Sequence, residues 1–378
     1  MLRKNEKTPD PCGSPPLRKG VVVVGMSGGV DSSVAAYLLR EQGYRVIGLF
    51  MKNWEETDDA GCCTATRDYD DVRRVCEALD IPYYAVNFAR QYMDNVFRVF
   101  LDGLKRGITP NPDVLCNREI KFGPFLEHAQ KLGADYIATG HYCSGGLGTL
   151  KKAADKSKDQ TYFLSGVTKE QLSKVIFPLG DLQKTEVRAI AKKMGLVTHD
   201  KKDSTGICFI GERNFRAFMK TYLGNQAGDI KTLDGRVVGK HEGLMYYTIG
   251  QGKGLGIGGV RGADNGKWFV IKKDLSTNTL YVHNGDHPSL YSKVVTAHNF
   301  NWIVPPPEGP FKCTATTRYR QPDTPCTVEI TPFHKGGAAQ AAGVFVRATF
   351  DTPVKTAVAG QWLVLYNGDV CMGGGEIV

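Results

Sequence analysis

The segment TPNPDVLCNREIKFG places a cysteine among groups that could make its thiol reactive. Cys116 follows Asp113 by three residues and precedes Arg118 by two. Pro110 and Pro112 stiffen the chain before it, which predicts an ordered loop that leads into a helix. A thiol near a helix N-terminus and an arginine has a lowered pKa and reacts as the thiolate. Asp113 could act there as a general base or as a hydrogen-bond partner.

A second candidate, Cys208, lies much later in the chain, in KKDSTGICFIGERNF. Taken alone it looks like an ordinary strand cysteine between the apolar Ile207 and Phe209. No two of the chain's ten cysteines have C-x-x-C spacing, which argues against a zinc ribbon, a thioredoxin-type motif and a local iron–sulfur nest. A functional cysteine must therefore work singly or meet a distant partner through the fold. We expect inert, half-buried thiols at Cys76, Cys143 and Cys371.

A run of valines ends at Gly25 in VVVVGMSGGVDSSVAAYLL, and a turn of small residues then opens into a helical pattern. The Walker A pattern fails, because its second glycine would fall on Val30 and no lysine follows. The G-x-G-x-x-G pattern fails because Ser27 replaces its second glycine. Consecutive backbone N–H groups, serine hydroxyls and a helix N-terminus remain, and together they suit an anion. Asp31 is better explained as a magnesium-site or positioning group than as a phosphate contact, because two anions repel.

The string SGGVDSS resembles the signature of the ATP-pyrophosphatase (PP-loop) superfamily. The resemblance implies cleavage of ATP between its α- and β-phosphates, adenylation of a carbonyl oxygen, and a loop that holds the departing pyrophosphate. It also explains why no lysine is needed for a γ-phosphate. The ATP-binding residues that it implies are Gly25, Met26, Ser27, Gly28, Gly29, Val30, Asp31, Ser32, Met51 and Gly140. For Met51, core packing is the equally favoured alternative.

Behind SGGVDSS, the motifs TPNPD-LCN, ATGHY, KDQ-YFL, DSTGICFIGER and TRYRQ follow in order. Together they resemble the tRNA-specific 2-thiouridylases, over roughly residues 21–378. The resemblance implies that Cys208 carries a persulfide, that Cys116 is the nucleophile, and that the two form a disulfide intermediate. It makes Asp113 the general acid/base and places Asn111 and Pro112 beside the target base.

The same resemblance implies tRNA as a partner, together with an upstream protein that donates persulfide sulfur through a cysteine desulfurase relay. Arginines beside an aromatic ring, as in TTRYRQ, suit phosphate contacts and base stacking, although exposed barrel residues would look alike. We expect ATP and Mg²⁺ as the substrate pair, no permanently bound cofactor, and a monomer. The implied tRNA contacts are His141, Lys158, Asp159, Gln160, Arg318, Tyr319 and Gln361.

The elements that must position these residues alternate between strand and helix from residue 21 to about 142. Strand candidates are Val21–Gly25, Tyr44–Met51, Pro82–Phe88 and Asp135–Tyr142, with amphipathic stretches between them. This alternation predicts an α/β fold with a doubly wound parallel sheet. Ligands bind such sheets at the carboxyl ends of the strands, where Gly25–Ser33 (called the phosphate loop below) and Thr139–His141 lie.

The character of the chain changes after about residue 210, where glycine-rich turns and short strands dominate. The alternating strands after about 290 predict a small antiparallel β-barrel. We therefore expect a flexible basic tail over 1–19, a PP-loop catalytic domain over 20–210, a small tRNA-contacting domain over 211–288 and a tRNA-contacting barrel over 289–378.

Composition excludes some classes of protein and permits others. The net charge of +9 is compatible with a polyanionic partner without requiring one. No apolar run approaches the roughly 20 residues that span a bilayer, and the first twenty residues lack the apolar core of a secretory signal. We therefore expect a cytoplasmic protein that does not bind membranes.

Two other functions stay open on these patterns. One is an ATP-pyrophosphatase synthetase that acts on a small-molecule carbonyl, a reading that leaves the paired cysteines without a task. The other is an RNA-binding module that uses ATP only as a conformational ligand, and it predicts tRNA binding without release of pyrophosphate.

Overall fold

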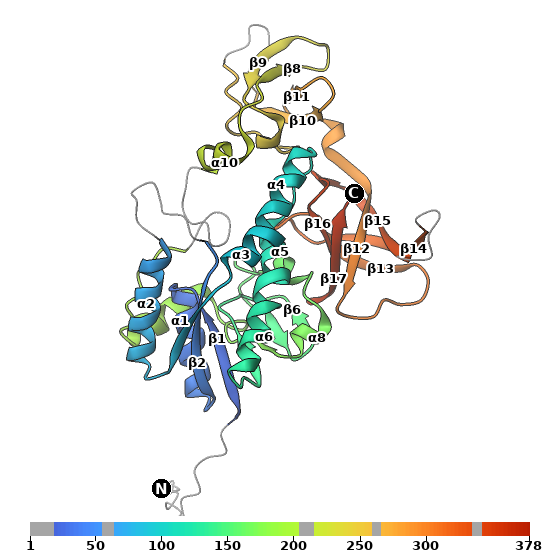
Figure 1. Cartoon of the computed structure of the whole chain (residues 1–378). Coiled ribbons are helices and arrows are strands. Elements are labelled where there is room, and N and C mark those ends of the chain that lie inside the picture. Colours follow the sequence, from blue (N-terminus) through green and yellow to red (C-terminus); the bar gives the residue numbers. More distant parts are fainter. Residues whose placement is uncertain (1–18, 55–63, 204–214, 259–265, 335–341) are drawn as a thin grey trace, which may run out of the picture.

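The computed structural model describes residues 19–54, 64–203, 215–258, 266–334 and 342–378 (Figure 1). The expected tail lies almost entirely outside these residues, and so does Cys208. Within the described part, no helix is both long and apolar enough to cross a membrane.

A parallel sheet forms the centre of the N-terminal half, as the alternation of elements predicted. Its strands pair in the order β7-β4-β1-β2-β3. They are β1 (Val21–Met26), β2 (Arg45–Lys52), β3 (Tyr83–Asn87), β4 (Tyr136–Ala138) and β7 (Val175–Ile176). The valine run of β1 is buried on both faces of the sheet, as expected for a central parallel strand.

Helices cover both faces of this sheet, which confirms the doubly wound α/β class. One face packs on α1 (Val30–Glu41), α2 (Thr64–Ala78) and α9 (Lys184–Lys193). The other packs on α3 (Ala89–Tyr92), the π-helix η1 (Met93–Phe97), α4 (Arg98–Lys105), α5 (Pro112–Cys116), the π-helix η2 (Asn117–Lys121) and α6 (Pro124–Lys131).

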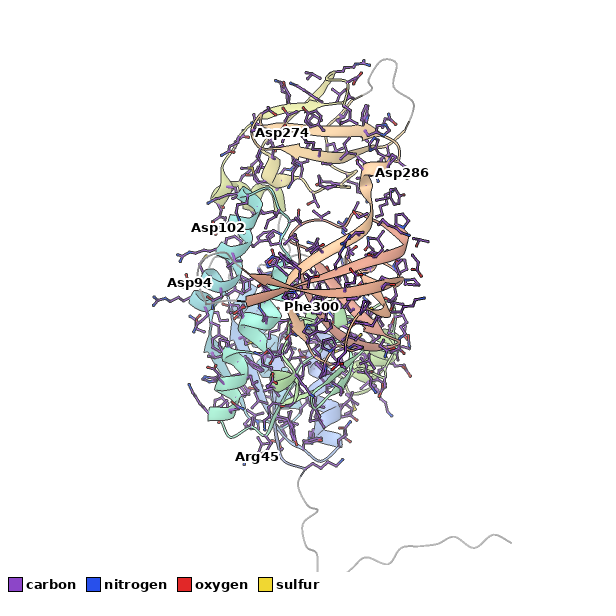
Figure 2. The ribbon with its side chains drawn as sticks, turned by 90° about the vertical axis from the view of Figure 1, so that its right-hand side faces the viewer. Arg45, Asp94, Asp102, Asp274, Asp286 and Phe300 are labelled. Atoms are coloured by element: carbon purple, nitrogen blue, oxygen red, sulfur yellow. The ribbon has the colours of Figure 1, made fainter. Side chains whose placement is uncertain are left out.

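The predicted antiparallel barrel is also present. Its strands run in the order β12-β15-β14-β13-β16-β17 and close through pairing of β12 with β17. They are β12 (Tyr291–Trp302), β13 (Phe311–Thr316), β14 (Thr324–His334), β15 (Ala342–Lys355), β16 (Trp362–Asn367) and β17 (Val370–Ile377). Figure 2 faces this barrel, with Phe300 on its strands and Arg45 at the far end of the parallel sheet.

A separate four-stranded sheet lies between the two larger parts in sequence and at the top of Figure 1. Its order is β10-β11-β8-β9, and Asp274 and Asp286 mark this end in Figure 2. The strands are β8 (Gly228–Lys231), β9 (Val237–His241), β10 (Trp268–Asp274) and β11 (Thr279–Asn284). Helix α10 (Phe215–Leu223) and the 3₁₀ helices η3 (Leu244–Tyr246) and η4 (Pro288–Leu290) complete this region.

The barrel is joined to the parallel sheet, a feature that the sequence did not predict. Residues 144–176 contain β5 (Ser144–Gly146), β6 (Thr149–Lys151), α7 (Thr161–Leu164) and α8 (Lys169–Leu172). Val370 of β17 pairs with Lys151 of β6, so one sheet of 13 strands runs through both parts. Trp362, Val364 and Tyr366 of the barrel belong to the same buried cluster as Cys116.

Candidate active site

The phosphate loop lies where the strand order of the parallel sheet reverses, between the carboxyl ends of β1 and β4. Gly29 caps α1 without a side-chain hydrogen bond, so the first-turn N–H groups of the helix keep their capacity to bind an anion. Gly28 has φ of +73°, and a Cβ there would lie 2.6 Å from the carbonyl oxygen of Asp68. Both the backbone angle and the contact with α2 therefore require glycine at this turn.

Gly140 brings the end of β4 against the start of α1. A Cβ at Gly140 would lie only 2.7 Å from the backbone nitrogen of Ser32 and 2.9 Å from the carbonyl carbon of Asp31. The Ser32 hydroxyl accepts a hydrogen bond from the Ser27 N–H at 3.2 Å and donates one to the Gly29 carbonyl at 3.2 Å. Several expected ATP-binding residues thus form one compact turn.

Met51 is buried at the end of β2, beside the phosphate loop. Its Cε lies 3.5 Å from the position of a Cβ on Gly25, and its side chain is 7% exposed. This placement fits both alternatives from the sequence, a pocket wall and a core residue. Its contact with adenine stays a prediction.

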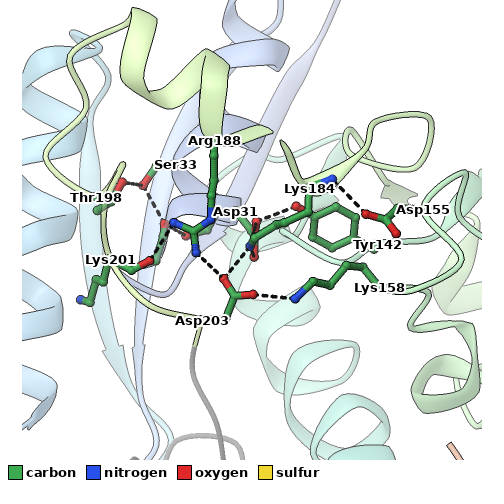
Figure 3. A network of polar contacts seen from close by, with 12 residues as sticks. Asp31, Ser33, Tyr142, Asp155, Lys158, Lys184, Arg188, Thr198, Lys201 and Asp203 are labelled. Atoms are coloured by element: carbon green, nitrogen blue, oxygen red, sulfur yellow. Dashed lines mark hydrogen bonds and ion pairs between the residues drawn. The ribbon is translucent and has the colours of Figure 1, made fainter. Parts of the chain in front are cut away.

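The carboxylate of Asp31 is neutralised by a lysine from the far side of the sequence (Figure 3). Lys184, the first residue of α9, places Nζ 2.7 and 2.8 Å from the two oxygens of Asp31. The Tyr142 hydroxyl donates to the same carboxylate at 2.8 Å. Burial and the proximity of Asp31 raise the pKa of Tyr142, so it remains a donor. A neutralised Asp31 no longer repels a phosphate at the helix N-terminus.

Asp203 forms ion pairs with three cationic side chains beside the Asp31–Lys184 pair. Its carboxylate accepts from Lys158 at 2.7 Å, Lys184 at 2.8 Å and Arg188 at 2.9 Å. Burial of the carboxyl favours its neutral form, but the bonds to Lys158 and Lys184 outweigh it and lower the pKa of Asp203 to about 2. Lys184 therefore bridges two acidic groups, one in the phosphate loop and one five residues before Cys208.

Lys201 makes a second connection to the phosphate loop. Its Nζ donates to the carbonyl of Gly28 at 2.9 Å and to Asp68 and Asp71 at 2.8 and 2.7 Å. The chain that leads toward Cys208 is thus fixed to the phosphate loop at Lys201 and at Asp203.

The helix that carries Cys116 is fixed by a cap and by apolar packing. Asn111 Oδ1 accepts from the N–H groups of Asp113 and Val114 at 3.1 and 3.2 Å, and Pro112 takes the first helical position. This is the cap that the TPNPD segment is suited to form. The Cys116 side chain is fully buried, and Asp113 lies half-buried in the first turn.

One histidine connects the Cys116 helix to the phosphate loop. Lys121 ends the helical run that begins with α5, and its Nζ donates to His141 Nε2 at 3.4 Å. Nδ1 of His141 then carries the proton and donates to Thr139 Oγ1 at 2.7 Å. Burial, assisted by Lys121, lowers the pKa of His141, so the ring is neutral. His141 follows Gly140 directly, so the two expected halves of the site meet here.

The barrel supplies the other wall of the Cys116 segment. Gln361 Nε2 donates to the carbonyl of Thr109 at 2.7 Å. The ring of Tyr319 lies 4.3 Å from that of Phe163 on α7. Burial raises the pKa of Tyr162, and Arg318 is close enough to oppose this rise. Three expected tRNA contacts thus lie against α7 and the chain before the Cys116 helix, although their binding to tRNA stays a prediction.

Trp362, the first residue of β16, packs between the barrel and α7. A Cβ on Gly166 would lie 2.8 Å from Trp362 Cη2, and the Tyr162 hydroxyl bonds to the Trp362 backbone. The Arg118 guanidinium lies 5.8 Å from the Trp362 ring and donates to Glu119 at 2.6 Å.

The remaining expected tRNA triplet has partners inside the protein. Lys158 pairs with Asp203, and Asp159 accepts from the Ala153 N–H and the Thr161 hydroxyl at 2.8 and 2.7 Å. Gln160 Oε1 accepts from the Tyr142 N–H at 2.9 Å. These hydrogen bonds show that Lys158, Asp159 and Gln160 help to hold the fold together. Their contact with tRNA stays a prediction.

A magnesium ion at Asp31 stays a prediction. Both of its oxygens bind Lys184, and the described residues contain no group of three or more His, Cys, Asp or Glu that could hold a metal ion. Lys184 is the cation beside Asp31 in the described residues. The positioning role, which the sequence left as the alternative, is compatible with the observed contacts.

Sequence reasoning missed Lys184, Lys201 and Asp203. One signal was available: Lys184 begins a helix, where a positive charge opposes the helix dipole. A lysine there needs a partner elsewhere, and Asp31 is that partner.

Three family models match the chain in succession. Residues 20–212 match the tRNA methyl transferase HUP domain, 216–284 the tRNA methyl transferase PRC-barrel domain and 292–377 the aminomethyltransferase beta-barrel domain. Among solved structures, U34-tRNA thiolase NcsA from Methanococcus maripaludis shares 20% identity with a TM-score of 0.35, over 52% of this chain and 60% of its own.

Curated relatives match almost the whole chain. The tRNA-specific 2-thiouridylase MnmA 2 of Geobacillus kaustophilus is 57% identical over 362 residues, covering 94% of both chains. The tRNA-specific 2-thiouridylase MnmA of Listeria monocytogenes is 56% identical over 363 residues, again covering 94% of both. Identity at this level, over this length, shows that the chain belongs to the family of MnmA tRNA-specific 2-thiouridylases.

Proposed function

We propose that this chain places sulfur on C2 of the wobble uridine of tRNA. ATP first adenylates the uracil O2 and releases pyrophosphate, because O2 leaves poorly as an oxide and well as an AMP ester. The outer sulfur of a Cys208 persulfide then attacks C2 and expels AMP. The Cys116 thiolate attacks Sγ of Cys208, sulfur remains on C2, and the two cysteines end as a disulfide that a thiol reductant reopens.

The observation that carries this proposal is the chain of contacts from the phosphate loop to the Cys116 helix. Gly140 packs on the first turn of α1, and the adjacent His141 bonds to Lys121, five residues after Cys116. These five residues advance the helical run by no more than about 7.5 Å, so a nucleotide at the loop and a base near Cys116 would be neighbours.

The charges of the loop support adenylation. Lys184 neutralises Asp31, and the uncapped N–H groups of α1 can then receive the pyrophosphate that leaves. Mg²⁺ would come with ATP as its phosphate complex. Asp113, in the first turn of α5, is the proposed acid/base that serves the target uracil.

The anchored segment before Cys208 supports the delivery of sulfur. Cys208 follows Asp203 by five positions, and an extended chain of that length spans about 18 Å at most. The persulfide is therefore tethered to the phosphate loop through Lys184. We propose that a separate persulfide-carrying protein loads it, that tRNA binds along Arg318, Tyr319 and Gln361, and that the enzyme acts as a monomer.

An in vitro assay tests this function. The purified chain is incubated with unmodified tRNA, ATP, Mg²⁺ and sulfide or a persulfide donor, and the tRNA is digested for nucleoside mass spectrometry. We expect 2-thiouridine at the wobble position, with one pyrophosphate released for each. Pyrophosphate release that is indifferent to tRNA would instead favour a synthetase of small molecules.

A further inference from the structure

Two cysteines that the proposed reaction does not use face each other in the barrel. Cys313 on β13 and Cys326 on β14 are paired directly across the antiparallel ladder, and their Sγ atoms are 3.8 Å apart. Both side chains belong to the apolar interior of the barrel, where Cys326 is buried and Cys313 is partly exposed.

The backbone here already has the spacing of a disulfide. Directly opposed residues of an antiparallel pair have Cα atoms about 4.5–5.5 Å apart, within the range of about 4.4–6.8 Å that a disulfide requires. Rotation of the two side chains would bring the sulfurs into bonding distance.

The segment between these cysteines contains the expected tRNA contacts Arg318 and Tyr319. It is fastened to the rest of the protein at several points. Gln321 Nε2 donates to the carbonyl of Lys355 at 2.6 Å, Asp323 pairs with Lys152, and Tyr319 lies against Phe163. Covalent closure beneath this hairpin would therefore restrain a surface next to the Cys116 helix.

We propose that Cys313 and Cys326 form a thiol–disulfide pair that closes a covalent ring around the Arg318–Tyr319 hairpin. The oxidant is a low-molecular-weight disulfide such as oxidised glutathione. The more exposed Cys313 thiolate attacks one sulfur and releases a first glutathione thiolate, which leaves a mixed disulfide. The Cys326 thiolate attacks Sγ of Cys313 and releases the second. Two electrons pass from the cysteines to glutathione, and the two thiol protons pass to the released thiolates or solvent.

Peptide mapping tests the pair directly. The full chain carrying Cys116→Ser and Cys208→Ser, which removes the proposed catalytic disulfide, is equilibrated with oxidised glutathione, alkylated and digested with trypsin. Cleavage at Lys312, Arg318 and Arg320 separates CTATTR from QPDTPCTVEITPFHK. We expect these peptides to be disulfide-linked and to separate after reduction. Alkylated free thiols at both positions, or a mixed disulfide that never resolves, would overturn the proposal.

Adding Cys313→Ser to this background provides the matched control, and tRNA affinity provides a second measurement. We expect oxidation to change the tRNA dissociation constant about threefold or more in the parent, and to leave the Cys313→Ser protein unchanged. This second arm rests on the proposed function. A disulfide that forms without any change in tRNA affinity would uphold the thiol pair and overturn the tRNA-binding role of the hairpin.

Discussion

The phosphate loop and the Cys116 helix meet at one edge of the sheet, but different forces hold them. Around the loop, Lys184, Lys201 and Asp203 make ion pairs in which most partners are partly exposed to solvent. Around the helix, Asn111 caps the backbone and Trp362 closes an apolar core. Ion pairs can exchange partners when a polyphosphate arrives, whereas a packed core keeps its geometry. The candidate site thus combines an adaptable set of charges at the phosphate loop with a fixed position for Cys116, the proposed nucleophile.

Substitution of the two proposed catalytic cysteines should have the largest effect on activity. We expect Cys116→Ser and Cys208→Ser each to abolish thiolation, because a hydroxyl can neither carry a persulfide nor resolve one, while ATP binding survives. Nucleoside mass spectrometry and nucleotide binding measure the two properties. Cys76→Ala, in a core position on the opposite face of the sheet, should retain thiolation. Thiolation by either purified serine variant would contradict the proposed mechanism.

Removal of Trp362 tests whether the Cys116 helix depends on apolar packing. We expect Trp362→Ala to lower the free energy of unfolding by about 3–5 kcal/mol, because it empties a buried site between the barrel and α7. Denaturant titration measures the loss. Val294→Ala, on an exposed barrel position, should change stability by no more than about 0.5 kcal/mol. Equal effects of the two substitutions would contradict a shared core.

Neutralisation of Lys184 tests whether the ion pairs around the phosphate loop contribute to ATP binding. We expect Lys184→Met to weaken ATP binding about tenfold, equivalent to about 1.4 kcal/mol, because Asp31 and Asp203 would lose their common cation. Calorimetry at two salt concentrations measures the loss. Lys192→Met lies on the exposed part of the same helix and serves as the control. Unchanged ATP affinity in Lys184→Met would show that the ion pairs are only structural.

Low pH should weaken the ion pairs near the phosphate loop through the Asp203 carboxyl, while the apolar packing around the Cys116 helix does not involve this carboxyl. The Asp203 carboxyl has a pKa of about 2 in the folded protein, below its usual 3.8. Its ion pairs therefore stabilise the protein fully above about pH 4, and this contribution is lost as the pH falls toward 2. Thermal unfolding between pH 4 and 2 should consequently depend less on pH in Asp203→Asn than in the parent. The exposed Asp200→Asn should follow the parent.

The cap at Asn111 should give the smallest effect on stability. We expect Asn111→Ala to cost about 1 kcal/mol, and Asn111→Asp to restore most of it, because aspartate caps a helix equally well. Denaturant titration measures both variants. If Asn111→Asp restores stability without restoring thiolation, the asparagine amide acts on the target base as well as on the helix.

The sequence predicted the parallel sheet, the barrel and the position of the phosphate loop, because each of these depends on local patterns. Four β-branched runs and the SGGVDSS turn lie within short stretches of chain, where periodicity and turn chemistry can be recognised. The ion pairs could not be found in this way. Asp31 and Lys184 are separated by 153 positions, and the chain has 48 lysines and arginines. Only the folded chain selects which of these cations meets the phosphate loop.

The same distinction explains the wall around Cys116. The TPNPD segment indicated a capped helix, and the structure has one at Asn111. Nothing in AGQWLV indicated that Gln361 and Trp362 would reach across to Thr109 and Gly166, because those contacts depend on how the barrel is placed against α7.

The pairing of β17 with β6 makes the barrel a structural part of the enzyme rather than a detachable RNA-binding accessory. For the exchange of parts between related enzymes, the stretch after residue 289 is therefore too small a unit. In a barrel moved to another enzyme, the residues equivalent to Gln361 and Trp362 would have to fit the positions that correspond to Thr109 and Gly166 in the recipient. Without that fit, the Cys116 helix would lose the apolar surface against which it packs.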